Sequence, residues 1–309
     1  MKNKIVIGLL LSIVFLVNGC HRKSEPTSDI VPTELFVAMH GGEKPAQFKA
    51  AWEPLRLHLE KKLGVKVKFF FTSDYTSIIQ ALRSKKVHMA DIPPFAYIIA
   101  TQKPGLSPIV TMGLNGAPAM YKSFIFTNPQ TGIKTIEDLK TNSGKLTLCF
   151  SDPASTSGHL IPRAYLMSIG LDPLKSFGET KFCGTHAATL LSVKTGKVDI
   201  GCASWDLSYA KLLREGMVKE SEIVELWRSP AIINNCVVVR DEINKEFVQK
   251  VKDIFLNAAS DDYNAFKTYA NLYYPDPSHM SYIPVADSSY NSLRKIAGSL
   301  ADINLLDKK

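Results

Sequence analysis

The chain has 309 residues, of which 45% are hydrophobic and 21% are charged, and its formal net charge is +8. This composition excludes a disordered, collagen-like or low-complexity protein, and the length suggests about two domains. The basic residues are dispersed, and the denser groups around residues 61–62 and 83–86 are typical of solvated surfaces. We therefore expect no nucleic-acid partner.

The first residues have the pattern of an export signal. Lys2 and Lys4 precede a nearly unbroken apolar run over residues 5–17. This run is shorter than the roughly 20 residues that a transmembrane helix needs, and it is typical of a secretory signal. Gly19 and Cys20 follow, which resembles a bacterial lipobox, in which the cysteine is lipidated and becomes the first mature residue. An ordinary signal peptide with an incidental cysteine is the alternative.

These features predict a lipoprotein signal peptide over residues 1–19, and a lipidated Cys20 with a flexible tether over residues 20–32. The acyl chains would anchor the exported protein to the cell envelope, in the periplasm or on the outer face of the cytoplasmic membrane, without spanning the bilayer. Removing residues 1–19 takes away two lysines and no acidic residue, so the formal charge falls from +8 to +6.

After the tether, short apolar segments alternate with amphipathic ones, which indicates an α/β fold with mainly parallel strands. A capping-box pattern at Thr135 predicts one short helix. The spacing predicts strands over residues 33–39, 65–72, 88–92, 109–112, 121–127, 146–150, 180–183, 198–203, 223–227 and 236–240. It predicts further helices over residues 46–62, 74–82, from 93 onward, 158–169, 187–194, 207–215, 244–259, 263–272 and 288–301.

One predicted strand-to-helix junction carries three consecutive hydroxyl residues, Ser155, Thr156 and Ser157. A helix N-terminus offers free backbone N–H groups and a partial positive charge, and hydroxyl groups add further donors. Together these groups suit a tetrahedral oxyanion. Ordinary helix capping needs one hydroxyl group and not three, which favours a ligand site over a cap.

A second junction, over residues 182–188, contains His186. Its ring can donate to an anion and can change its charge near neutral pH. A structural histidine whose hydrogen bonds are satisfied within the protein is the alternative.

Four cysteines besides Cys20 lie in strand-like segments, namely Cys149, Cys183, Cys202 and Cys236. Outside the cytoplasm an even number permits disulfides, and buried free thiols are an equally good interpretation. The cysteines and histidines do not have the spacing of a metal site, so we expect neither a metal nor another cofactor.

The segment from Ser155 to Pro162 resembles the Ser-Thr-Ser-Gly-x-x-x-Pro signature of the phosphate/phosphite/phosphonate-binding proteins of ABC importers. Residues 73–75, 91–97, 184–186 and 196–199 also fit this family, in order, and the resemblance covers roughly residues 33–245. It implies a two-lobed periplasmic-binding-protein fold of type II, with a ligand cleft between lobes joined by two crossovers.

The family's site residues can be placed on this sequence. The resemblance implies that Ser155, Thr156 and Ser157 hold the oxyanion and that His186 donates to it. It also implies that two aromatic residues of the first lobe close over the ligand, and these fall on Tyr75 and Tyr97. Each of the two could equally be a half-buried core tyrosine.

Relatives that bind aminoalkylphosphonates use acidic residues for the amine, and the first of these falls on Asp206. An N-cap for the next helix is an alternative role for Asp206. The second acidic position falls near Asn234 or Asn235, and the residue after His186 is Ala187, so neither place supplies an acid. These departures leave phosphate, phosphite and a small alkylphosphonate as candidate ligands beside an aminoalkylphosphonate.

We therefore predict a monomeric solute-binding lipoprotein that captures a small phosphorus oxyanion and delivers it to the transmembrane subunits of an ABC permease. Lobe one is expected over residues 33–121 plus 239–309, and lobe two over residues 122–238. The strands at 121–127 and 234–240 are expected to adjoin the hinge.

Two alternatives stay open. The same fold could bind another small anion or serve a sensor system. A serine hydrolase would use Ser157, His186 and Asp206, but the chain lacks the G-x-S-x-G motif that presents such a serine. We therefore expect a protein that is not an enzyme.

Overall fold

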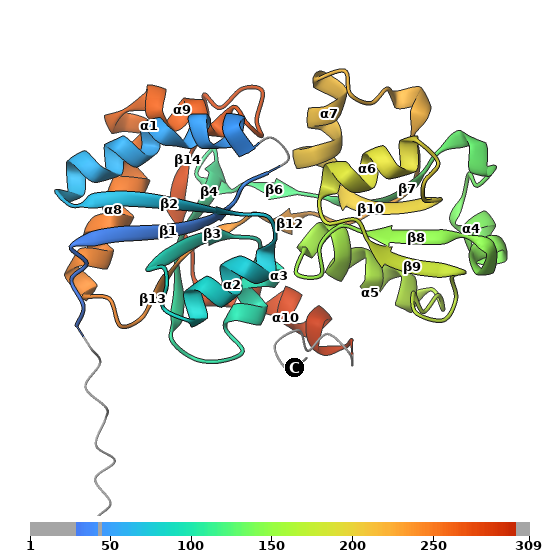
Figure 1. The fold of residues 1–309 in the computed structure, drawn as a ribbon, viewed down its shortest axis with the longest axis horizontal. Coiled ribbons are helices and arrows are strands. Elements are labelled where there is room, and N and C mark those ends of the chain that lie inside the picture. Colours follow the sequence, from blue (N-terminus) through green and yellow to red (C-terminus); the bar gives the residue numbers. More distant parts are fainter. Residues whose placement is uncertain (1–28, 43–44, 301–309) are drawn as a thin grey trace, which may run out of the picture.

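The computed structural model describes residues 29–42 and 45–300, so the predicted signal peptide and Cys20 lie outside the described residues. Figure 1 shows two lobes side by side, each with a central sheet that helices cover. The predicted α/β class is confirmed. The first lobe is built from both ends of the described chain, and the second lobe from its middle.

The first lobe contains a seven-stranded mixed sheet. β1 is parallel to β2 and β3, whereas β13, β4 and β14 pair antiparallel. The parallel pairs are joined through helices, because parallel strands need a crossover connection. The strands in spatial order are β14 (Met280–Pro284), β4 (Leu106–Leu114), β13 (Cys236–Arg240), β3 (Met89–Ile92), β1 (Glu34–His40) and β2 (Lys66–Thr72), and β5 (Ala117–Pro118) pairs with β4.

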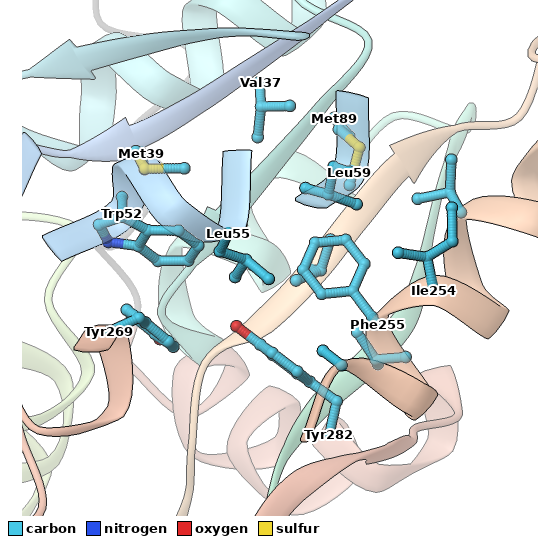
Figure 2. Close-up of a cluster of buried hydrophobic side chains, with 14 of the residues drawn as sticks. Val37, Met39, Trp52, Leu55, Leu59, Met89, Ile254, Phe255, Tyr269 and Tyr282 are labelled. Carbon is cyan, nitrogen blue, oxygen red and sulfur yellow. The ribbon is translucent and has the colours of Figure 1, made fainter. Parts of the chain in front are cut away.

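Helices cover both faces of this sheet, and side chains that alternate along β1 contribute to the core on each face. Val37 and Met39 of β1 belong to a core with Trp52 and Phe255, which Figure 2 shows. Ala38 belongs to the core on the other face. The first core contains residues of α1 (Pro45–Leu63), α8 (Lys245–Asp261) and α9 (Tyr263–Ala270), and the second contains residues of α2 (Tyr75–Arg83), α3 (Pro94–Ala100) and α10 (Asn291–Gly298).

The second lobe repeats this plan with five strands. The strands in spatial order are β11 (Val224–Arg228), β7 (Ser123–Thr127), β10 (Ile200–Ser204), β8 (Thr147–Phe150) and β9 (Glu179–Phe182). One face is covered by α6 (His186–Lys194) and α7 (Ala210–Arg214), and the other by α4 (Ile136–Asn142) and α5 (Ile161–Ser168). β9 is an edge strand, and its pairing is with β8.

Two short strands, β6 (Met120–Tyr121) and β12 (Ile232–Ile233), pair antiparallel where the chain crosses between the lobes. The predicted strand over residues 121–127 is therefore divided into β6 and β7. The predicted lobe boundary between residues 238 and 239 is wrong, because it falls within β13, which pairs with β3 and β4. The second crossover lies at β12 instead.

The remaining elements match the predictions within a few residues, with a few exceptions. The sequence pattern does not predict β5 or β14. The helices expected over residues 158–169 and 207–215 each begin earlier, with a π-helical turn over Thr156–Leu160 and over Trp205–Tyr209. The predicted capping box at Thr135 is present at the start of α4. Within residues 29–42 and 45–300, no helix is long and apolar enough to cross a membrane.

Candidate functional site

A cavity of about 110 Å³ lies between the lobes, which is several times the roughly 10–15 Å³ that one water molecule needs. Its lobe-two wall is formed by the starts of three helices. Its lobe-one wall is rich in tyrosine. The lining residues used below are His40, Tyr75, Asp91, Tyr121, Ser151, Asp152, Ser155, Ser157, His186, Ser204, Lys211, Asn234, Asn235, Tyr269, Tyr273, Tyr274 and Tyr282.

The first helix start follows β8 and contains the three predicted hydroxyl residues. Ser155 is the N-cap, and its Oγ accepts from the Gly158 N–H at 2.9 Å. A hydroxyl group that accepts still has its own proton to donate, so Ser155 can serve both as cap and as ligand donor. Ser155 and Ser157 line the cavity as predicted.

Gly158 lets this turn approach its neighbours closely. A Cβ atom at this position would lie 2.5 Å from Ser151 Cβ and 2.9 Å from His186 Cε1. Contacts this short force a shift in the backbone or in the neighbouring side chains. The glycine of the signature therefore allows the first helix start to pack against His186.

The second helix start follows β9 and carries His186. Its Nδ1 accepts from the Ser204 N–H at 3.3 Å and lies 3.1 Å from Ser151 Oγ. Burial, with a smaller contribution from the nearby His40, lowers the pKa of His186 to about 3. The ring is therefore neutral at neutral pH. Because Nδ1 accepts, Nε2 holds the proton and makes His186 a neutral donor.

The third helix start follows β10. Ser204 is its N-cap, accepts from the Leu207 N–H at 3.2 Å, and lines the cavity. Lys211 of α7 is the only lysine or arginine on the cavity wall among the described residues. The lobe-two wall thus combines hydroxyl donors, one neutral imidazole and one lysine, a set of groups that suits an anion.

The lobe-one wall contains Tyr75, as predicted, at the first position of α2. Its ring lies against His40 with centroids 4.8 Å apart, and its backbone N–H donates to Asp152 Oδ2 at 3.3 Å. This hydrogen bond joins the two lobes, because Asp152 belongs to the loop after β8. Tyr75 is therefore placed to close over a ligand that lobe two holds.

Two carboxyl groups on the cavity wall are not anticipated by the sequence analysis. Burial raises the pKa of Asp91 and of Asp152 to about 6. Asp91 Oδ1 accepts from Asn235 Nδ2 at 3.0 Å, and Asp91 Oδ2 lies 3.5 Å from the Tyr269 hydroxyl. Asp91 is within a matched family segment, but a single acidic residue at the end of a buried strand carries no distinct signal.

Aromatic residues from distant parts of the chain complete the lobe-one wall. Tyr121 lies at the hinge, where burial raises the pKa of its phenol and the nearby Thr156 and Ser157 oppose this rise. Four more tyrosines come from the C-terminal part of the chain, namely Tyr269, Tyr273, Tyr274 and Tyr282. No local motif marks these four tyrosines as site residues, because α9, the segment after it and β14 join the first lobe only through tertiary packing.

Three predicted site residues are not on the cavity wall. Tyr97 of α3 is fully buried, its hydroxyl donates to Asp287 and its ring lies 5.0 Å from that of Tyr290. Asp206 accepts from the Lys122 N–H at 2.7 Å beside the hinge, and it is not the N-cap. Both side chains therefore have hydrogen-bond partners within the protein.

Thr156 is the third predicted site residue that does not line the cavity. Its side chain is fully buried, and its Oγ1 accepts from the Phe95 N–H of lobe one at 2.9 Å. Phe95 follows two prolines, which have no N–H, so it supplies the first free donor of α3. The Thr156 hydroxyl thus forms a contact between the lobes and is not among the groups that line the cavity.

The residues of the hydrolase alternative do not form a catalytic triad in the structure. His186 Nδ1 faces the Ser204 N–H and Ser151 Oγ, whereas Asp206 is bonded to the Lys122 N–H. The question of the cysteines, which the sequence left open, is also answered. Cys149 and Cys183 form a disulfide, and Cys202 and Cys236 are buried free thiols.

Comparison with known proteins decides the family. The family model described as "ABC transporter, phosphonate, periplasmic substrate-binding protein" matches residues 37–290. The chain belongs to this family. Members of this phosphonate-binding family are periplasmic substrate-binding proteins of ABC transporters for phosphonate or phosphate, and the resemblance seen in the sequence is confirmed.

Individual members of the phosphonate-binding family align over most of the chain. The "Phosphonates-binding periplasmic protein" of Escherichia coli is 31% identical over 262 residues, which are 83% of this chain and 75% of the relative. The "Phosphate-import protein" of Mycolicibacterium smegmatis is 28% identical over 301 residues, or 92% of each chain. A solved binding-protein component of a Pseudomonas aeruginosa ABC phosphonate transporter has a TM-score of 0.74 at 25% identity, with 85% of each chain covered.

Proposed function

We propose that this member of the phosphonate-binding family is an envelope-anchored lipoprotein that binds a small phosphorus oxyanion between its lobes and delivers it to an ABC permease. The observation that carries the proposal is the lobe-two wall. There, Ser155, Ser157 and the neutral donor His186 converge on one cavity.

The groups of this wall suit a tetrahedral anion. An anion that leaves water loses many hydrogen bonds, and a protein site must replace them. Hydrogen bonds from hydroxyl, N–H and imidazole donors to a charged group contribute about 1.5–3 kcal/mol each. A cavity of about 110 Å³ restricts the ligand to a small one. Phosphate, phosphite and short-chain phosphonates meet both conditions.

Two hydrogen bonds across the cleft support a closing mechanism. Thr156 of lobe two accepts from the Phe95 N–H, and Asp152 of lobe two accepts from the Tyr75 N–H. Both form only when the lobes are together. Ligand binding would favour this arrangement by a hinge motion at β6 and β12. A permease that recognises the closed form would then receive the loaded protein.

The anchor rests on the sequence. The short apolar run and Cys20 support lipidation after export. The predicted tether over residues 20–32 is shortened at its end, because Ile30 pairs with Ile243 of the folded part. The residues before it would let the folded lobes reach a permease in the same membrane. The ligand and the anchor are separate claims, so each can be tested without the other.

Calorimetric titration of residues 21–309 tests the ligand. We expect binding of at least one of phosphate, phosphite, methylphosphonate and 2-aminoethylphosphonate, and weaker binding of sulfate. The amine is included because Asp91 places a carboxyl group on the lobe-one wall. Binding of none of the four would contradict the proposal.

Substitution of Ser155 tests the wall itself. Ser155→Ala removes a donor to the ligand, and we expect a loss of about 1.5–3 kcal/mol of binding free energy. The matched control is Ser168→Ala at the other end of α5, whose exposed hydroxyl donates to the Tyr165 carbonyl. Equal affinities of the two variants would remove Ser155 from the site.

A further inference from the structure

We infer that the Cys149–Cys183 disulfide is a positioning element of the anion site, which holds His186 in register with the hydroxyl residues after β8. This inference rests on the proposed function, since it assumes that His186 donates to the ligand. It goes further by assigning a role in binding to a covalent bond that does not touch the ligand.

The disulfide joins the ends of β8 and β9, where the two loops that carry the site begin. Cys149 is in β8, two residues before Ser151, and Cys183 follows the last residue of β9, three residues before His186. Two backbone hydrogen bonds extend the same connection toward the cavity. The Cys183 N–H donates to the Phe150 carbonyl, and the Gly184 N–H donates to the Ser151 carbonyl, both at 2.8 Å.

Besides these two hydrogen bonds, the loop on the β9 side is held by the Phe182 ring, whose centroid lies 5.8 Å from that of Phe150 and 5.0 Å from that of His159. β9 is an edge strand of four residues whose pairing is with β8 alone. Its last residue, Phe182, is 44% exposed. Gly184 is exposed and has a left-handed φ of +89°, and no atom lies within 4 Å of the place where a Cβ would stand. The disulfide therefore supplies the covalent tie that this loop otherwise lacks.

The direction of the His186 ring depends on that tie. Nε2 can face the cavity as a donor only while Nδ1 stays near the Ser204 N–H and Ser151 Oγ. Ser151 is itself held, because its Oγ donates to the Cys202 carbonyl at 2.8 Å. If β9 separates from β8 once the disulfide is lost, His186 moves while Ser151 stays in place. The Nε2–H group of His186 then loses its orientation toward the cavity.

An exported protein meets conditions in which disulfides persist. Dithiothreitol reverses the bond in the test tube. Two successive thiol–disulfide exchanges break the S–S bond and form two thiols, and the reagent is oxidised to its cyclic disulfide, so that two electrons and two protons are transferred. Reduction thus removes the tie from the wild-type protein without changing any residue.

The main experiment is a double-mutant cycle. We expect Cys149→Ala/Cys183→Ser to weaken binding of methylphosphonate or phosphate by about tenfold, which is the effect of losing one good hydrogen bond to an anion. In a His186→Ala background the same pair of substitutions should change affinity less than twofold. A disulfide that acts only on general stability would weaken binding equally in both backgrounds.

Two controls accompany the cycle. Val198→Ala destabilises the same apolar core without touching either loop, so its affinity shows the effect of lowered stability alone. Dithiothreitol should weaken binding by the wild-type protein and leave the variant without the disulfide unchanged. If that variant fails to fold, the reduced wild-type protein serves in its place, and unfolding of the reduced protein would overturn the inference.

A readout that needs no ligand separates this inference from the proposed function. Hydrogen exchange of the amides over residues 184–189 should be faster in the reduced protein, whereas amides of α5 should be unchanged. If no probe anion binds the wild-type protein, the proposed function fails and the exchange experiment still tests the tie. Unchanged exchange over residues 184–189, or an unchanged affinity after reduction, would overturn the inference.

Discussion

At the scale of single residues, burial shifts the pKa of three groups on the cavity wall toward their uncharged forms. His186 is neutral because burial lowers its pKa to about 3, and Asp91 and Asp152 have pKa values of about 6 for the same reason. A neutral imidazole donor loses less solvation on closure than an imidazolium would. In the proposed function, an anion would meet neutral donors and Lys211 on the lobe-two wall.

The pKa of Asp91 leads to a pH prediction. The folded value of about 6 lies above the ordinary 3.8, so Asp91 binds a proton more readily in the folded protein. Its contribution to stability is therefore present below pH 3.8 and is lost as the pH rises through about 6. Ionisation also places a negative charge on the wall that faces the ligand.

We expect anion affinity of the wild-type protein to fall relative to Asp91→Asn as the pH rises from 5 to 8, by about tenfold. Calorimetry of both proteins with the same anion measures this ratio, and the ligand's own ionisation cancels from it. Asp253→Asn on the exposed face of α8 is the control. A ratio that is independent of pH would show that the Asp91 charge does not reach the ligand.

At the scale of elements, the capping of α2 places Tyr75 at the cavity. Asp74 is the N-cap, and its Oδ1 accepts from the Ser77 N–H at 2.7 Å. Loss of such a cap costs about 1 kcal/mol. Because Tyr75 is the first residue of this helix, fraying there would also release the Asp152 contact across the cleft.

We expect Asp74→Ala to lower stability by about 1 kcal/mol and to weaken anion binding several-fold. Asp74→Asn keeps a good cap without the charge and should keep most of the affinity. Thr135→Ala removes the equivalent cap of α4, which lies away from the cavity, so it should lower stability alike and leave binding unchanged. Chemical denaturation and calorimetry measure the two effects, and a binding defect in Thr135→Ala would refute the distinction.

Two strands of the first lobe, β4 and β14, show where the sequence pattern is too weak to predict a strand or its start. β4 begins at Leu106, three residues before the predicted start, because Pro108 lies at an irregularity in its pairing with β13 and does not end the strand. β14 contains Ser281 and ends in Pro284, so its apolar pattern is short, and it is held in the sheet by pairing with β4. Both strands depend on partners that are distant in the sequence.

At the scale of the whole molecule, Thr156 links the site to closure. Its Oγ1 satisfies the Phe95 N–H of the other lobe, which in the open form would face water. Removing the acceptor leaves this buried N–H unpaired in the closed form only, at a cost of about 1–3 kcal/mol.

We therefore expect Thr156→Val to weaken anion binding by about tenfold or more and to reduce the closed fraction at saturating ligand. Small-angle X-ray scattering would detect the closed fraction as a smaller radius of gyration. Thr156→Ser retains the hydroxyl group and should behave like the wild-type protein. If the valine variant closes and binds normally, the contact between the lobes contributes nothing to function.

The sequence alone determined the α/β class, the helix starts after β8 and β9, and the residues Ser155, Ser157 and His186 at the cavity, because these follow from local patterns and a contiguous family signature. Only the tertiary structure decided that Tyr97 turns toward Asp287, that Asp206 braces the hinge and that Thr156 bonds to the other lobe. It also decided which cysteines form the disulfide and that β13 belongs to the sheet of the first lobe. The carboxyl groups and the further tyrosines on the cavity wall were likewise visible only in the tertiary structure. The physical reason is that a residue's neighbours along the chain set its backbone conformation, whereas the partner that its side chain meets is set by packing between segments far apart in the chain.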